Sequence, residues 1–192
     1  AIGTVILPAL SRQHASEDPK AFSATLDWAM RMVLLVGVPA ALALLVLAEP
    51  LIATLFHYGA MTERDTLQAS AALRAYSIGV MTFMLIKVLA PGYFARQDIK
   101  TPVKIAITCM VVNMGFNLIL IWPLAHVGLA LATSLSAVLN ASLLWWGLRK
   151  AGIYQAQPGW PVFAARLIVA CVAMALVIVW MVPEIEQWFA WG

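Results

Sequence analysis

Runs of apolar residues close to 20 long dominate this chain and limit what it can fold into. Five such runs cover residues 32–48, 72–90, 103–122, 126–148 and 162–182. A helix rises about 1.5 Å per residue, so about 20 residues cross a hydrocarbon layer about 30 Å thick. A spanning segment must also satisfy its backbone hydrogen bonds internally, and these runs are too long for barrel strands. We therefore expect an all-α bundle with five transmembrane helices.

Composition and motifs narrow the class of protein further. Only 11% of the 192 residues are charged, whereas soluble domains average about 25%. An aqueous enzyme, a secreted disulfide scaffold and a nucleic-acid-binding module are therefore poorly supported. Cys109 and Cys171 lie inside apolar runs and are expected to be small core residues. No spacing of ligands or nucleophiles predicts a metal site, a cofactor or an enzyme.

Prolines and polar residues mark the ends of the apolar runs. We expect the pairs at 49–50 and 91–92 to end the first and second spans, and Pro123 to end the third. Residues 51–58 are apolar but too short to cross, which predicts a short helix at the outer interface. Residues 1–10 look like the end of a preceding span, so we expect the chain to begin inside a longer protein.

Basic residues gather in alternate connections between the runs. Nine of the twelve Lys and Arg residues lie before the first run, after the second or after the fourth: Arg12, Lys20, Arg31, Arg96, Lys100, Lys104, Arg149, Lys150 and Arg166. Connections on the other side contain only Arg64. Cytoplasmic loops of membrane proteins are enriched in Lys and Arg. The nine residues are therefore predicted to face the cytoplasm.

The two remaining cations, Lys87 and Arg74, lie within the second run and are the candidate substrate-binding residues. A charge at membrane depth is costly and commonly faces a wet cavity, so Lys87 could bind an anionic substrate. It could equally extend its ammonium group to the headgroups, as long basic side chains do. Arg74 lies nearer the outer end of the run, where an interfacial anchor is the favoured interpretation.

A second candidate site consists of polar residues on the third and fourth spans. Asn113 and Asn117 are four residues apart and so share a helix face, and Thr133 lies on the next span. Their oxygens could coordinate a coupling cation such as sodium. Hydrogen bonding between packed helices is the preferred alternative, because no carboxylate accompanies these residues at that depth.

Four local motifs resemble those of a known family. The most specific is Lys87-Val-Leu-Ala-Pro-Gly-Tyr-Phe-Ala-Arg-Gln-Asp-Ile-Lys-Thr-Pro-Val-Lys104, and the others are Leu7-Pro-Ala-Leu-Ser-Arg12, Leu55-Phe-His-Tyr-Gly59 and Gln157-Pro-Gly-Trp160. Together they resemble the MurJ (MviN) family of bacterial lipid II flippases over essentially the whole chain. One departure is the order Tyr93-Phe94, where the family would have Phe before Tyr.

The resemblance implies a two-lobed exporter of fourteen helices, in which this chain is the end of the eighth helix through the thirteenth. It further implies a multi-pass protein of the bacterial inner membrane. Such a protein would move lipid II, an undecaprenyl-pyrophosphate-linked precursor, to the periplasmic leaflet by alternating access. The family's cavity arginines would lie upstream. Asn113, Asn117 and Thr133 would match a sodium site of some relatives, with Asn117 in place of their carboxylate.

Two other functions remain open from the sequence. One is a multidrug or other polysaccharide-lipid exporter of the same superfamily. The other is a noncatalytic membrane subunit that scaffolds cell-wall assembly. Expected partners are lipid II and membrane lipids, with sodium or protons as candidate coupling ions and no nucleic acid. We expect a monomeric parent protein.

Overall fold

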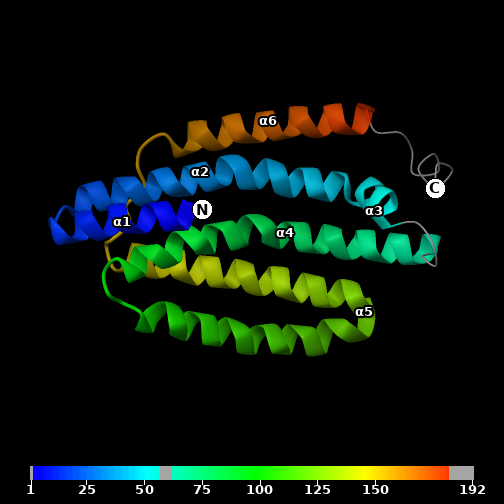
Figure 1. The fold of residues 1–192 in the computed structure, drawn as a ribbon, viewed down its shortest axis with the longest axis horizontal. Helices are drawn as coiled ribbons and strands as arrows, with labels where there is room; N and C mark the ends of the chain where they lie inside the picture. The colour runs from blue at the N-terminus through cyan, green and yellow to red at the C-terminus, as the bar shows by residue number, and fades with distance from the viewer. Residues whose placement is uncertain (1, 57–61, 182–192) are drawn as a thin grey trace.

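Long helices lying side by side along one direction make up almost the whole structure (Figure 1). The computed structural model describes residues 2–56 and 62–181, and within these ranges it has no β-strand. The helices are α1 (Ile2–Ala15), α2 (Pro19–Val46), α3 (Ala48–Phe56), α4 (Glu63–Phe94), α5 (Lys100–Lys150) and α6 (Trp160–Met181). The prediction of an all-α bundle of membrane-spanning helices is confirmed.

Four helices of the described chain, α2, α4, α5 and α6, are long and apolar enough to cross a membrane. The longest, α5, is a hairpin whose backbone reverses at Ala125 (φ 45°, ψ −123°). Its first arm (100–124) and second arm (126–150) contain the two runs that the sequence predicts as separate spans. The hydroxyl of Ser136 donates to the carbonyl oxygen of Cys109 at 2.8 Å, which joins the arms.

Two predicted helix ends are wrong. Pro123 does not end the first arm, because the reversal needs the positive φ that Ala125 adopts two residues later. Pro91 and Gly92 do not break α4, which continues to Phe94. A proline removes one hydrogen bond, but both residues are buried against neighbouring helices that hold the backbone helical. The chain turns at Gln97, where φ is 61°.

The end of the first predicted span and the start of the short predicted helix also differ from the structure. Helix α2 ends at Val46, before the predicted end of the first span at residue 48. Glu49 and Pro50, which were predicted to close that span, lie instead in the first turn of α3. The short helix α3 therefore begins three residues before the predicted range. The remaining predicted residues, 57–58 and 182, lie outside the described ranges.

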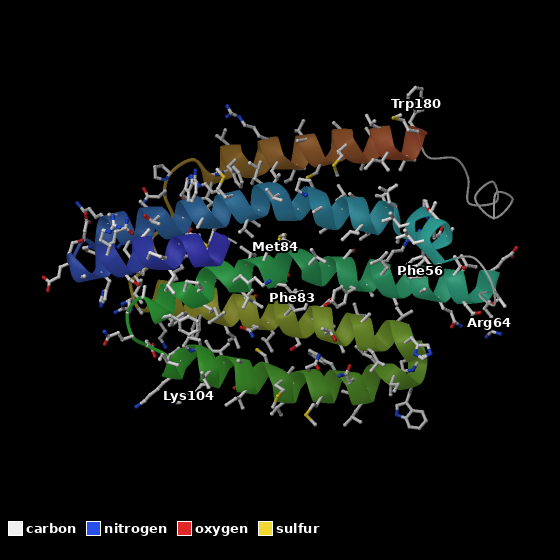
Figure 2. All side chains as sticks on the ribbon, in the orientation of Figure 1. Phe56, Arg64, Phe83, Met84, Lys104 and Trp180 are labelled. Atoms are coloured by element: carbon white, nitrogen blue, oxygen red, sulfur yellow. The ribbon has the colours of Figure 1, made fainter. Side chains whose placement is uncertain are left out.

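One end of the bundle, called here the basic end, collects most of the positive charge. The N-terminal ends of α2 and α6, the C-terminal end of α4 and both ends of α5 lie there (Figure 1). Figure 2 shows Lys104 at this end, with Arg64 at the opposite end. It also shows Trp180 of α6 pointing away from the bundle. The grouping of charge that the sequence predicts is thus a feature of the folded chain.

Close packing is confined to part of the bundle. The main core joins α1, α2, α4 and the second arm of α5, and its fully buried leucines are Leu10, Leu26, Leu89, Leu144 and Leu148. Cys109 and Cys171 are buried free thiols, as predicted. In contrast, α6 packs mainly on α2, and only its residues Leu167 and Cys171 are buried.

Candidate functional site

Lys87 occupies the exposed side of α4, seven residues before the helix ends at Phe94. It makes no ion pair or hydrogen bond with any residue that the structure describes. Pro91 lies four residues later and has no N–H, so the carbonyl oxygen of Lys87 lacks the donor that a helix normally supplies. The ammonium group of Lys87 and a carbonyl oxygen without its usual i+4 donor thus lie within one turn of an apolar helix. This polar point is available to an anionic ligand or to water.

Arg74, the other predicted substrate-binding residue, has a partner. Its Nη1 lies 3.0 Å from Oε1 of Glu49 in α3, and the two side chains are 44% and 25% exposed. The pair connects α3 to α4 near the end opposite the basic end. The charge of Arg74 is therefore compensated by Glu49, whereas Lys87 has no acidic partner among the described residues. The structure does not bring the two cations together, because they are thirteen residues apart on α4.

The predicted polar residues of the third and fourth spans are only partly brought together. Asn113 and Thr133 line a cavity of about 220 Å³ between α4 and the arms of α5, together with Ser136 and Asn140. Asn117 does not line it; its Nδ2 donates to Oδ1 of Asn113 at 3.1 Å. The hydroxyl of Thr133 donates to the carbonyl oxygen of Leu129 in its own helix.

These residues do not complete a cation site by themselves. No carboxylate lines the cavity, and one of its amide oxygens, that of Asn113, already accepts a hydrogen bond from Asn117. Hard cations in proteins take several oxygen ligands and usually carboxylates. Oδ1 of Asn117 is buried without a partner among the described residues. The arrangement therefore suits helix packing better than ion binding.

Close contacts fix α4 against the second arm of α5. The hydroxyl of Ser134 donates to the carbonyl oxygen of Ala75 at 2.8 Å, and that of Tyr93 donates to the carbonyl oxygen of Leu144 at 2.8 Å. At Gly79, an added Cβ would lie 2.8 Å from Oγ of Ser134. The sequence suggests Gly79 as either a hinge or a static kink. Its place in a tight helix contact favours the static role.

Sequence reasoning missed a polar cluster at the basic end, called here the clasp and formed by Asp27, Arg31, Tyr154 and Trp160. Asp27 is 2% exposed in α2. Its Oδ1 accepts hydrogen bonds from the hydroxyl of Tyr154 at 2.8 Å and from Nε1 of Trp160 at 2.7 Å. Its Oδ2 lies 2.8 Å from Nε of Arg31. The signal in the sequence was an Asp and an Arg one helical turn apart beside an apolar run.

The clasp attaches the connection between α5 and α6 to α2. Nη2 of Arg31 donates to the carbonyl oxygens of Gln157 and Pro158 at 3.2 and 3.1 Å. Its guanidinium carbon lies 5.2 Å from the ring centre of Trp160, the first residue of α6, a cation–π distance. Burial and the hydrogen bond to Asp27 raise the pKa of Tyr154. The buried carboxylate is therefore surrounded by donors from three segments.

Beyond the clasp, α6 is separated from α2 by an apolar groove of about 350 Å³. Val38 and Leu42 of α2 line it, with Cys171 and Val172 of α6. No polar group lines this groove. The lipid-like lining and the exposure of α6 suit contact with hydrocarbon chains.

Long apolar helices that run side by side, with cations gathered at one end, define a multi-pass membrane protein. The family model described as "Lipid II flippase MurJ" matches residues 1–191. The chain belongs to this family.

Similar proteins agree with this assignment. The chain is 49% identical to a probable lipid II flippase MurJ of Haemophilus influenzae over 98% of its length, and 48% identical to one of Vibrio cholerae over 100%. It is similar to a solved structure described as "Lipid II flippase MurJ, inward closed conformation", with a TM-score of 0.79, 26% identity and 99% of the chain covered. The chain spans 38%, 37% and 39% of these proteins, little more than a third.

Proposed function

We propose that this chain forms most of the C-terminal lobe of a lipid II flippase in the bacterial inner membrane. The observation that carries the proposal is the match of residues 1–191 to the family. The flippase would move a lipid-linked, pyrophosphate-bearing precursor from the cytoplasmic to the periplasmic leaflet. The chain would contribute binding and conformational work to this transport, with no bond made or broken.

The basic end supports an orientation for this lobe. Six of the nine cations that the sequence groups together lie in the first or last turns of helices or in the connections at that end. Lys104 and Arg166 lie in the second turns of α5 and α6, and Arg31 lies three turns into α2. Because Lys and Arg are retained on the cytoplasmic side, the basic end would face the cytoplasm. The reversal at Ala125 and the helix α3 would then face the periplasm.

Lys87 is our candidate for contact with the pyrophosphate. It lies about 10 Å from the end of α4 by helical rise, and a charge is more strongly attracted to an anion there than in bulk water. Arg74 is a weaker candidate because an anion would have to compete with Glu49. The lipid tail would lie along apolar α6 and its groove.

The last part of the proposal concerns a cation whose movement would be coupled to transport. We keep Asn113, Asn117 and Thr133 as its candidate ligands, with the missing negative charge to come from a segment outside the described residues. The described lining of their cavity contains no carboxylate or histidine to bind a proton, so sodium is the ion to test at this place. Replacing external sodium by choline during a transport assay tests this point. A rate that does not change would exclude sodium.

The central experiment replaces Lys87 in the intact protein, in cells whose own lipid II flippase can be depleted. We expect Lys87→Ala to lower the exposure of lipid II to an enzyme added outside spheroplasts, and Lys87→Arg to retain most of it. The matched control is Lys104→Ala, an exposed lysine at the basic end. Failure of the unchanged protein to restore lipid II exposure would overturn the proposed function. Normal exposure with Lys87→Ala would remove only Lys87 from it.

A further inference from the structure

A second cavity, called here the slot, lies between α2, α4 and the second arm of α5 and has a volume of about 500 Å³. Leu34 and Met81 line the end farther from the basic end, Leu85 and Ala141 line the middle, and Trp145 and Trp160 line the end nearest the basic end. It is separate from the groove beside α6 and from Lys87, neither of which contributes to its wall. Nothing in the proposed transport cycle uses it.

The shape of the slot suits a hydrocarbon chain. Its lining on α4 runs from Met81 to Leu89, about 12 Å by helical rise, so its mean cross-section is about 40 Å². Carbon atoms in contact are about 4 Å apart, so a hydrocarbon chain needs about 20 Å². The slot is therefore wide enough for one or two hydrocarbon chains.

The polar groups around the slot are mostly engaged elsewhere. The hydroxyl of Tyr154 and the ring N–H of Trp160 both donate to Asp27. The hydroxyl of Thr82 donates to the carbonyl oxygen of Ile78 in its own helix. The slot therefore presents mainly carbon and aromatic surface. The clasp also holds two of its walls in place, which lowers the cost of ordering the site when a ligand binds.

Charge beside the end of the slot nearest the basic end indicates the kind of lipid. The guanidinium carbon of Arg149 lies 5.2 Å from the ring centre of Trp145, and that of Arg31 lies 5.2 Å from Trp160. Arg31 is neutralised by Asp27. Arg149 is exposed and has no acidic partner among the described residues. One free guanidinium beside a hydrocarbon slot matches a lipid with one phosphate and a net negative charge, since a zwitterionic headgroup would bring its own cation.

We infer that the slot binds a hydrocarbon chain of an anionic membrane phospholipid, with its phosphate at Arg149. The lipid fills the space between α2 and the α4–α5 pair and bridges them at the basic end. This site is independent of the transported substrate, because its residues include neither Lys87 nor the surface of α6 beyond Trp160.

Photolabelling tests the site in the intact protein reconstituted in vesicles. The probes are phosphatidylglycerol and phosphatidylcholine that carry the same diazirine-bearing acyl chain, and labelled peptides are mapped by mass spectrometry. We expect phosphatidylglycerol to label the segments 81–89 and 138–145 several-fold more than phosphatidylcholine does. Both lipids should label the exposed face of α6 equally, which serves as an internal reference for nonspecific lipid contact.

Two substitutions form a matched pair. Arg149→Gln should reduce labelling of the slot by phosphatidylglycerol to the level of phosphatidylcholine. Lys150→Gln should leave it unchanged, because Nζ of Lys150 lies over Trp146, which does not line the slot. Ser142→Phe, at an exposed lining residue, should block labelling of the slot without altering that of α6, and thermal unfolding checks that the variant folds.

Three results would overturn the inference. Equal labelling of the slot by both lipids would exclude recognition of a net negative charge. Unchanged labelling in Arg149→Gln would exclude the phosphate site. Labelling of α6 without labelling of the slot would mean that another part of the protein occupies it. None of these results depends on transport, so the inference can fail while the proposed function stands.

Discussion

The hydroxyl of Tyr154 donates a hydrogen bond of 2.8 Å to Oδ1 of Asp27, a residue 127 positions earlier in the chain. This bond crosses from the connection before α6 to the first half of α2. Trp160 and Arg31 bind the same carboxylate. Asp27 is therefore the shared acceptor for three of the side chains that attach α6 at the basic end.

Loss of the Asp27 charge is expected to destabilise the protein strongly. Asp27→Asn leaves Arg31 without its buried counter-ion, and breaking a buried pair costs about 3–5 kcal/mol. Tyr154→Phe removes one hydrogen bond and should cost only about 1–2 kcal/mol. Unfolding by denaturant in detergent micelles measures both. The interpretation of the clasp would be wrong if Asp27→Asn were no more destabilising than Tyr154→Phe.

Alkaline pH is expected to weaken the clasp. The pKa of Tyr154 is raised above its ordinary value of 10.0, first by burial and then by the hydrogen bond to Asp27. Above pH 10 the unfolded chain loses this proton while the folded chain keeps it, so stability falls as pH rises. The contribution is fully present below pH 10. The free energy of unfolding of the parent protein and of Tyr154→Phe, measured between pH 8 and 11, isolates the contribution of Tyr154. If the two free energies changed with pH in the same way, the prediction would be contradicted.

Substitution of Gly79 tests the contact between α4 and α5. The Cβ of Gly79→Ala would lie 2.8 Å from Oγ and 3.2 Å from Cα of Ser134, and such overpacking costs about 1–3 kcal/mol. The matched control is Gly115→Ala, because nothing lies within 4 Å of a Cβ there. That change should stabilise the helix by up to about 1 kcal/mol. Thermal unfolding of the two variants should shift in opposite directions.

The role of Arg74 can be separated from that of a substrate ligand. We expect Arg74→Ala and Glu49→Ala to have similar small effects on stability, with a coupling below about 1 kcal/mol, because the pair is partly exposed. Lipid II exposure should be nearly normal in both single variants and in the double variant. A large loss with Arg74→Ala that persists in the Glu49→Ala background would instead assign Arg74 to the substrate.

Several features of this fold follow from the sequence because they depend on residues near one another in the chain. Helix type and approximate position were predictable from the length of the apolar runs. The position of the reversal inside α5 was predictable to within two residues. Pro123 predicted the turn, but the residue whose dihedral angles reverse the chain is Ala125. The continuation of α4 through Pro91 was not predictable, because packing by other helices keeps that segment helical.

The candidate sites were less predictable than the helices. Lys87 could be singled out because a charge within an apolar run is rare. The sequence could not show that Arg74 pairs with Glu49 while Lys87 has no acidic partner among the described residues. In the sequence, Lys87 and Arg74 are simply two cations in the same apolar run. Asn113 and Thr133 were predicted together, yet only the packing of the hairpin separates Asn117 from their cavity.

The sequence by itself determined that this chain crosses a membrane as helices, how its positive charge is distributed between two sides, and to which family it is similar. The first two properties follow from hydrophobicity and charge counted along short stretches of chain, and the third follows from short local motifs. Tertiary structure decided which charges are neutralised, how α6 is attached, and where the slot lies. Each of those depends on atoms a few ångströms apart that belong to residues tens of positions apart, which only packing brings together.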